Sequence, residues 1–337
     1  KEASIELNLR FMLFLGLLLL LLYQSVNELC KINYFMSILR LENVIKTYDK
    51  HTAVNNVSFD VPKGSIFGLL GPNGAGKTSL IRIITTITGA DSGTVLLDGE
   101  KLNSNHPGQI GYMPEERGLY KKMSVGDHLI YLARLKGLSA NDAKEAIQNW
   151  MKKFEIESWW DKKIEELSKG MQQKIQFIAT VCHNPPLLIL DEPFSGLDPL
   201  NTNLIKEEIE ELKNQGTSII FSTHRMEQVE EICERIVLIN AGEKILEGLV
   251  SDVKANFKEH KYKIEFDGGI PTNVFNEYEI LEQKDHSCVV RLKEERDSNH
   301  LLKKLIDSGT HVKSFKEILP TLNEIFINQV GEDLPAN

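Results

Sequence analysis

Residues 66–78 read IFGLLGPNGAGKT, an apolar run that leads directly into a glycine-rich segment. The segment from Gly71 to Thr78 matches the pattern G-x-x-x-x-G-K-[ST], and its flanks predict a buried strand over 66–70 and a helix over 79–86. Backbone N–H groups in such a turn surround phosphate oxygens, and the positive end of the following helix attracts the same anion. The flanking strand and helix therefore favour a phosphate-binding loop over a chance glycine-rich turn.

Lys77 and Thr78 give this loop its chemistry. The lysine adds a positive charge at the β- and γ-phosphates, which makes it a candidate for catalysis as well as for binding, and the threonine hydroxyl is a candidate ligand of Mg²⁺. The predicted nucleotide contacts of this segment are Gly71, Pro72, Asn73, Gly74, Ala75, Gly76, Lys77, Thr78 and Ser79.

A second apolar run, LLILDE at 187–192, ends in two carboxylates. A strand buried in a parallel sheet is apolar throughout, and such sheets bind ligands at the carboxyl ends of their strands. Asp191 is therefore predicted to hold Mg²⁺, directly or through water, and Glu192 to act as the general base on the attacking water. Alone, the run also fits a strand that ends in solvated acids; beside the phosphate-binding loop, catalysis is favoured.

Composition narrows the function further. The 337 residues predict two or three domains, and contents of 42% hydrophobic and 26% charged residues are typical of a soluble globular protein. The formal net charge of -9 argues against a nucleic-acid partner. Reduced thiols in a cytosolic protein are expected, because Cys30, Cys182, Cys233 and Cys288 form no C-x-x-C pair and no metal-binding spacing.

The N-terminal segment does not fit the rest of the chain. Residues 11–22 read FMLFLGLLLLLL, which is shorter than the about 20 apolar residues that span a bilayer. Met36 opens the stretch MSILRLENVIKTY, which reads as a natural beginning. We expect residues 1–35 to be an apolar extension outside the folded protein; a membrane-anchoring helix is the alternative.

The rest of the chain divides into strand-like and helical segments according to its sequence pattern. Strand-like runs near the loop and the carboxylates lie at 38–44, 57–61, 95–97, 109–113, 187–190, 218–222 and 236–239. Residues 115–168 read as helices, with N-caps predicted at Ser124 and Ser139 and a helix end at Gly137. After about residue 255, strands are expected at 262–266, 288–292 and 311–315, a helix at 298–308, and a last helix capped by Thr321.

These patterns predict an α/β fold. A P-loop nucleotide-binding domain with a parallel-sheet core is expected at 36–254, with a helical subdomain at about 115–168. A small C-terminal α+β domain is expected at 255–337.

The motif LSKGMQQ at 167–173 resembles the LSGGQ signature of the ATPase subunits of ABC transporters, and the resemblance extends over about residues 38–250. It implies an additional antiparallel β subdomain and an element that caps the γ-phosphate of ATP on the opposite subunit. Ser168 and Gly170 would begin a helix over 171–181, which is an anion-binding terminus. Lys169 and Met171 depart from the family pattern by replacing Gly and Gln; Met171 is retained as a candidate nucleotide contact.

Other residues match the family in order. Tyr48 resembles the aromatic residue that stacks on adenine, although, taken alone, it also fits an exposed tyrosine at the end of a strand. Glu115 stands where the family has a glutamine that senses Mg²⁺, and is assigned to both nucleotide and metal. Asp198, in SGLD at 195–198, resembles the loop that communicates across the nucleotide dimer. His224 resembles the switch histidine at the γ-phosphate and is the remaining catalytic candidate.

The stretches PEERGLY (114–120) and LSKGMQQK (167–174), together with the C-terminal domain, resemble ABC-2-type exporter ATPases of the sodium-efflux-like branch. The resemblance implies ATP and Mg²⁺ as cofactors and hydrolysis coupled to export through separate transmembrane permease subunits. It further implies a second ATPase subunit, of the same or a related kind, and a peripheral location at the cytoplasmic membrane face. Sodium, a drug, a peptide or a lipid-like molecule all remain open as substrate.

Two other classes are less favoured. A soluble ABC ATPase that acts on ribosomes usually carries two ATPase domains, whereas one phosphate loop and one signature occur here. A DNA-acting relative carries a long coiled coil, whereas residues 79–167 hold a compact helical insert without sustained heptads. A pure binding module would not need Glu192 and His224.

Overall fold

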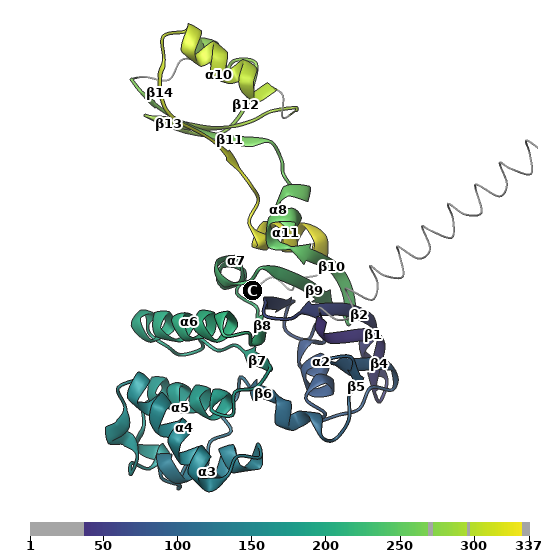
Figure 1. Cartoon of the computed structure of the whole chain (residues 1–337). Coiled ribbons are helices and arrows are strands. Elements are labelled where there is room, and N and C mark those ends of the chain that lie inside the picture. Colours follow the sequence, from purple (N-terminus) through teal and green to yellow (C-terminus); the bar gives the residue numbers. More distant parts are fainter. Residues whose placement is uncertain (1–36, 269–271, 295–296, 332–337) are drawn as a thin grey trace, which may run out of the picture. The chain divides into compact units, whose positions relative to one another are not determined.

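The structure is a computed structural model that describes residues 37–268, 272–294 and 297–331 (Figure 1). The expected extension at 1–35, with Cys30, lies outside these residues. The chain forms two compact units. One contains the chain up to His224 together with Val237–Lys244, and the other contains Arg225–Ile236 and the chain from Ile245 onward.

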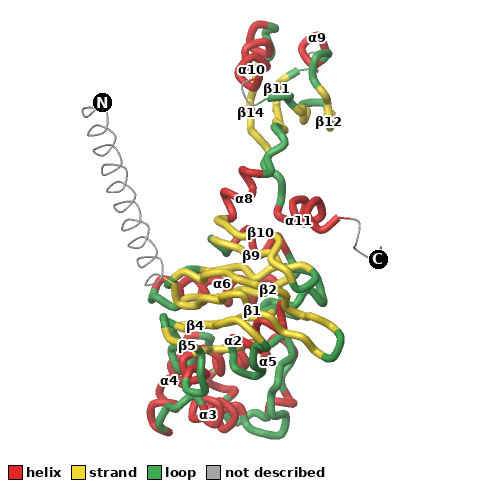
Figure 2. The backbone as a smooth tube through the Cα atoms, turned by 90° about the vertical axis from the view of Figure 1, so that its right-hand side faces the viewer, coloured by secondary structure: helices red, strands yellow, loops and turns green. Residues whose placement is uncertain are grey.

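The first unit opens with an antiparallel sheet in the order β2-β1-β4-β5. Its strands are β1 (Ser37–Tyr48), β2 (His51–Pro62), β4 (Ser92–Leu97) and β5 (Glu100–Lys101). Figure 2 shows β1, β2 and β4 side by side. Both long strands exceed the expected 38–44 and 57–61, because their ends form an exposed hairpin in which Tyr48 pairs with His51 and the apolar pattern fades. The antiparallel β subdomain is confirmed.

The second sheet has the order β10-β9-β3-β8-β7-β6. Its strands are β3 (Ile66–Leu70), β6 (Ile110–Met113), β7 (Leu187–Asp191), β8 (Ser218–Thr223), β9 (Arg235–Asn240) and β10 (Glu243–Leu249). Strands β3, β8, β7 and β6 are parallel, and every residue of β3, β7 and β8 is buried. Because Leu70 pairs with Thr223 and Asp191 with Ser222, the ends of these strands meet at one edge.

The first unit also contains several helices. They are α2 (Lys77–Ile84), α3 (Val125–Leu135), α4 (Ala140–Lys153), α5 (Lys169–Val181) and α6 (Pro199–Asn214), with short 3-10 turns η1 (His106–Gln109), η2 (Glu157–Trp159) and η3 (Ile164–Glu166). Helices α3, α4 and α5 contact one another (Figure 1). Helices α3 and α4 lie within the expected range of about 115–168, and α5 follows it.

The caps of these helices agree with the sequence in most details. The hydroxyls of Ser124 and Ser139 accept hydrogen bonds from the backbone of the third helical residue, and Gly137, with φ +96°, ends α3 as predicted. Two helix starts were wrong. Helix α2 begins at Lys77 and not at residue 79, because Gly76 is already its N-cap. Helix α5 begins at Lys169 and not at Met171, because the Ser168 hydroxyl caps the N–H of Met171 and so makes it the third residue of the helix.

The second unit contains a four-stranded antiparallel sheet in the order β12-β13-β11-β14. Its strands are β11 (Lys261–Asp267), β12 (Glu279–Lys284), β13 (Ser287–Arg291) and β14 (His311–Ile318), and its helices are α7 (Met226–Ile232), α8 (Val250–Asn256), α9 (Thr272–Phe275), α10 (Asp297–Asp307) and α11 (Leu322–Val330). From β11 to β14 the order is β-α-β-β-α-β, the ferredoxin-like arrangement. The predicted α+β domain is confirmed.

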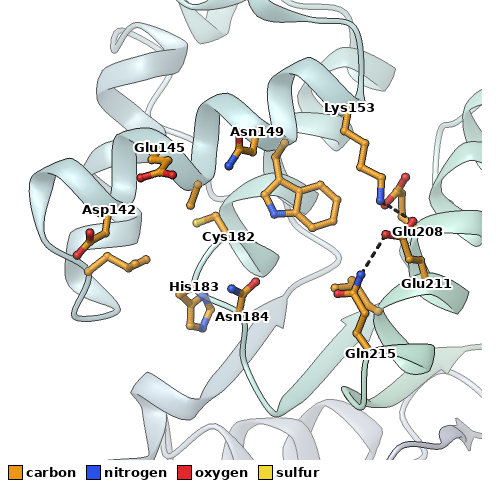
Figure 3. A pocket seen from close by; sticks show the side chains of 14 residues that line it. Asp142, Glu145, Asn149, Lys153, Cys182, His183, Asn184, Glu208, Glu211 and Gln215 are labelled. Carbon is orange, nitrogen blue, oxygen red and sulfur yellow. Dashed lines mark hydrogen bonds and ion pairs between the residues drawn. The ribbon is translucent and has the colours of Figure 1, made fainter.

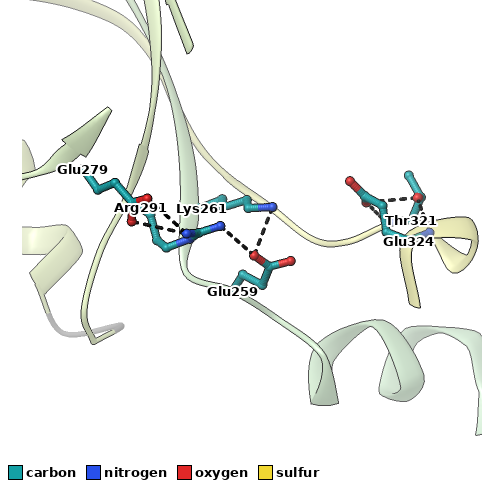
Figure 4. A network of polar contacts seen from close by, with 6 residues as sticks. All are labelled: Glu259, Lys261, Glu279, Arg291, Thr321 and Glu324. Carbon is teal, nitrogen blue, oxygen red and sulfur yellow. Dashed lines mark hydrogen bonds and ion pairs between the residues drawn. The ribbon is translucent and has the colours of Figure 1, made fainter. Parts of the chain in front are cut away.

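One face of this sheet packs on its helices and the other is polar. Alternate residues of β11, namely Tyr262, Ile264 and Phe266, are buried in a separate core with Leu301 and Leu305. On the polar side, Arg291 joins Glu259 and Glu279, and Lys261 also pairs with Glu259 (Figure 4).

Helix α11 packs against α7 within this unit. A capping box of Thr321 and Glu324 begins α11, as predicted and as Figure 4 shows. The carboxylate of Glu230 on α7 adds a second cap, because it accepts a hydrogen bond of 2.5 Å from the backbone N–H of Leu322 and also pairs with Lys254. Among the described residues, every helix is too short or too polar to cross a membrane.

Candidate nucleotide-binding and hydrolysis site

The glycine-rich loop is wedged between two strands, and two of its positions require glycine. At Gly71, with φ +150°, an added Cβ would lie 2.2 Å from the carbonyl oxygen of Ile239 on β9. At Gly76, with φ +108°, it would lie 2.3 Å from the carbonyl oxygen of Ala53 on β2. Backbone conformation and space both exclude a side chain, so these glycines fix the path of the loop.

Lys77 begins α2, and its side chain is folded into the loop. Its ammonium donates hydrogen bonds of 2.7 and 3.0 Å to the carbonyls of Gly71 and Pro72. Burial lowers the pKa of Lys77, and the negative charges of Asp191, Glu192 and Glu115 oppose that effect. These three carboxylates therefore lie close enough to Lys77 to act on its charge. The sequence had placed them in separate motifs.

The neighbouring loop residues face outward. Asn73, Gly74 and Thr78 are exposed, and Pro72 and Ser79 are half-buried, whereas Ala75 is buried and its carbonyl accepts from the N–H of Gly242. The hydroxyl of Thr78 is thus available at the mouth of the loop.

Asp191 is the last residue of β7 and is 8% exposed. One of its oxygens accepts a hydrogen bond of 2.8 Å from Ser222 on the adjacent strand. Burial is the largest influence on this carboxyl and raises its pKa, and Glu192 and Glu115 add to the rise. A buried acid that is held beside other acids is well suited to a cation, because bound positive charge relieves both effects.

Glu192 turns away from the strand, with φ +50°. Its carboxylate accepts hydrogen bonds from the backbone N–H of His224 at 2.8 Å and from the hydroxyl of Thr223 at 3.0 Å. The Nδ1 atom of the His224 ring lies 2.6 Å from the same carboxylate, so Nδ1 carries the hydrogen of this pair. The two predicted catalytic residues, which are 32 positions apart, therefore form one unit.

The signature segment lies at the start of α5. Ser168 and Lys169 are exposed, and Gly170 is half-buried; a Cβ added at Gly170 would lie 3.8 Å from the side chain of Leu197. Met171, also half-buried, donates its N–H to Ser168. Within the described part of the chain, Ser168 and Gly170 make no hydrogen bond to the phosphate-binding loop.

The other residues predicted to contact the nucleotide lie on separate elements. Tyr48 is the last residue of β1 and is 38% exposed, and the ammonium of Lys46 lies over its ring. Tyr48 pairs with His51 on β2. Two residues further along β2, Ala53 lies against Gly76 of the phosphate-binding loop. Asp198 caps α6 by accepting the N–H of Asn201 at 2.9 Å, and this bond lowers its pKa. That structural role was not predicted.

Sequence reasoning missed several side chains that hold these segments. Gln173 is 3% exposed and donates to the carbonyl of Pro193 at 2.8 Å, and Gln176 donates to the carbonyl of Pro114 at 2.7 Å. Arg117 donates to Gln173 and to Ser195. One signal was available: two glutamines occur on the otherwise apolar face of α5, where buried amides require partners.

A cavity of about 610 Å³ lies elsewhere, between α4, α6 and the turn at 182–184. Figure 3 shows its acidic lining, in which Lys153 bridges Glu208 and Glu211 at 2.6 and 2.7 Å. None of the predicted nucleotide contacts lines this cavity. It is therefore not the predicted nucleotide site.

Comparisons with known proteins identify the family. A family model described as ABC transporter matches residues 54–195, and one described as the C-terminal domain of DrrA1-3-like ATP-binding proteins matches residues 248–330. The ABC transporter ATP-binding protein YhaQ of Bacillus subtilis is 42% identical over 294 residues, covering 87% of this chain and 98% of that protein. This chain belongs to the ATP-binding proteins of ABC transporters.

Other similar proteins agree with this membership. Two further B. subtilis proteins are similar. The linearmycin resistance ATP-binding protein LnrL is 37% identical, and the match covers 64% of this chain and 70% of LnrL. The ABC transporter ATP-binding protein NatA is 34% identical, and the match covers 60% of this chain and 83% of NatA. A solved structure of the ATP binding subunit of an ABC transporter has a TM-score of 0.62 and 29% identity, covering 66% of this chain and 93% of that chain.

Several predictions are thereby confirmed: the ABC family, the P-loop fold class and the ATPase activity that this domain performs to power transport. The chain binds nucleotide and is a component of a membrane-associated transporter. The alternative of a soluble ABC ATPase is not favoured.

Proposed function

We propose that this chain uses ATP hydrolysis at the edge formed by the phosphate-binding loop, Asp191, Glu192 and His224 to drive export of a substrate through separate permease subunits. One observation carries the proposal. The carboxylate of Glu192 is held by the backbone N–H and ring of His224, one residue beyond buried Asp191 and within electrostatic reach of Lys77. A base, an orienting partner and a phosphate-binding cation in this arrangement suit phosphoryl transfer to water.

In the proposed mechanism, the loop residues 71–79 and Lys77 hold the phosphates, and Tyr48 contacts the adenine. Glu192 accepts a proton from a water molecule as the water oxygen attacks the γ-phosphorus and the bond to the β-phosphate oxygen breaks, which yields ADP and phosphate. His224 orients the carboxylate through its N–H and ring, and its exposed ring, 52% accessible, is free to contact the γ-phosphate.

Magnesium fits the oxygen donors at this edge. We propose that Thr78 and Asp191 hold it and that Glu115 adds negative charge beside it, since a hydroxyl and carboxylates are the donors that Mg²⁺ prefers. When bound together with the phosphates, the ion supplies charge neutralisation in phosphoryl transfer.

We further propose that the transporter contains two ATPase subunits, with Ser168, Gly170, Met171 and Asp198 of one acting on ATP held by the other. The ATPase domain would extend over 36–254 and the accessory domain over 255–337. The subunit would lie at the cytoplasmic face, where ATP is present. Relatives named for Nod factor export and for linearmycin resistance favour an exported substrate, and the second of them favours a drug-like one.

A purification from native membranes tests the transport assignment. We expect a tagged chain, extracted in mild detergent, to copurify with an integral membrane protein, and we expect that complex in proteoliposomes to move its substrate only with ATP. A complex with Lys77→Ala should assemble and not transport, because the lysine charge is lost from the phosphate site. Recovery of the chain with ribosomes and without a membrane protein would refute the assignment.

Replacing Glu115 by glutamine tests the metal proposal. The change removes one negative charge near the ion without changing side-chain size, so the Mg²⁺ concentration that gives half-maximal ATPase activity should rise about threefold to tenfold. Glu116→Gln is the matched control, because the neighbouring Glu116 is exposed and is not among the charges that act on Lys77. Identical Mg²⁺ curves for the two variants would remove Glu115 from the metal site.

A further inference from the structure

We propose that Arg117 is a positioning residue for ATP hydrolysis, and this proposal rests on the proposed function. Its guanidinium joins the segment after β6, which carries Glu115, to the segment after β7, which carries Glu192, through Gln173 on α5. Arg117 touches neither the phosphate-binding loop nor Glu192 in any hydrogen bond among the described residues, so it acts through the segments that it holds.

The contacts of Arg117 use two sides of its guanidinium. Its Nε donates to the side-chain oxygen of Gln173 at 3.2 Å, and its Nη2 donates to the backbone carbonyl of Ser195 at 3.4 Å. A Cβ at Gly196 would lie 3.2 Å from the same Nη2. The guanidinium therefore lies close against the backbone of 195–196. A planar group with several fixed N–H directions can serve two acceptors at once, whereas a lysine ammonium on a flexible chain holds them less well.

Gln173 completes the connection. Its amide nitrogen donates to the carbonyl of Pro193 at 2.8 Å, which leaves the amide oxygen to accept from Arg117. One helical turn away on α5, Gln176 donates to the carbonyl of Pro114 at 2.7 Å. Because Gln173 is 3% exposed, loss of Arg117 would leave its buried oxygen without that partner.

These ties lie next to the proposed catalytic groups. Pro193 directly follows Glu192, and Pro114 directly precedes Glu115. A movement of either segment shifts a carboxylate that acts on Lys77. Small displacements of catalytic groups reduce rates strongly, by up to about a hundredfold for roughly 1 Å. Binding of ATP depends chiefly on the loop at 71–79 and should be little affected.

Steady-state kinetics on the purified full chain tests this role. We expect Arg117→Ala to lower kcat about tenfold to a hundredfold, with KM for ATP close to the parent value. The midpoint of thermal unfolding should fall by only a few degrees, because a single buried oxygen loses its partner. Arg117→Lys should recover only part of the rate. The matched control is Arg134→Ala, which removes an exposed arginine from α3 and should leave kcat unchanged.

A double-mutant cycle separates positioning from a general structural effect. If Arg117 acts through Gln173, the loss in kcat for Arg117→Ala combined with Gln173→Ala should be smaller than the product of the two single losses. Parent kcat in Arg117→Ala, a raised KM at constant kcat, independent losses in the cycle, or a rate loss that accompanies a large drop in thermal stability would each overturn the proposal. A parent rate in Glu192→Gln would instead overturn the proposed function.

Discussion

Glutamine at position 192 is expected to lower kcat for ATP hydrolysis by about a thousandfold or more while ATP affinity stays within about twofold of the parent. The amide has nearly the size of the carboxylate, and its oxygen can still accept from the backbone N–H of His224 and from Thr223. It cannot take a proton from water. The single change therefore removes the base while keeping the contacts that shape the site.

The measurement is single-turnover and steady-state ATPase activity, together with equilibrium binding of a fluorescent ATP analogue. Glu227→Gln is the matched control, because this exposed glutamate lies three residues after His224 and has no proposed role in the reaction. Turnover at the parent rate in Glu192→Gln would exclude Glu192 as the base. Loss of nucleotide binding would show instead that the residue supports the phosphate site.

Mixing two inactive variants is expected to restore part of the ATPase activity if the site is shared between subunits. Lys77→Ala removes the phosphate-binding cation of one chain, and Ser168→Arg places bulk and charge where the signature of the other chain would meet the γ-phosphate. A mixed dimer then has one composite site with both defects and one with neither. If the two variants pair at random in an equal mixture, about half of the dimers contain one chain of each kind. Each of these mixed dimers has one intact site.

The same model predicts ATP-dependent association. In a Glu192→Gln background, ATP with Mg²⁺ should give a dimer by light scattering, and ADP should not, since ATP held by both subunits stabilises their association. Adding Ser168→Arg should prevent that dimer. The γ-phosphate of each bound ATP would lie between two helix N-termini, and each N-terminus would stabilise the bound phosphate by about 0.3–2 kcal/mol.

A mixture that stays inactive, although each variant folds and pairs with parent protein, would contradict the shared site. The exposure of the signature segment is compatible with the shared site. Ser168 and Gly170 begin α5 with exposed or half-buried backbone, and in the described part of the chain no hydrogen bond links them to the phosphate-binding loop. In the proposed arrangement, a second subunit supplies the contact between the signature segment and the γ-phosphate.

Local patterns in the sequence were enough to predict the elements that carry the site. The run at 66–78 predicts strand β3 and the loop, because glycine and lysine positions in that motif follow from phosphate binding alone. The helix after it was also predicted, although α2 begins two residues earlier than expected. The apolar run at 187–190 predicts β7, because a fully buried strand has no polar face. Ser124, Ser139 and Thr321 predict helix starts, since a cap is made within four residues of the chain.

Other elements lacked a local signal. Strand β12 (Glu279–Lys284) was not predicted, because it is a largely exposed edge strand whose pairing with β13 depends on its neighbour and not on its own apolar pattern. The start of α5 was misplaced because Ser168, the residue assigned to anion binding, is also the N-cap that decides where the helix begins.

The partners of the catalytic side chains were decided by tertiary structure alone. Pairing of β7 with β8 sets Asp191 opposite Ser222 and thereby brings Thr223 and His224 to Glu192. Sequence spacing contains no register between two parallel strands, because the connection between them is long and its length does not fix their alignment. The motifs thus determined which residues carry the chemistry, and the sheet register and the face of α5 decided which of them touch.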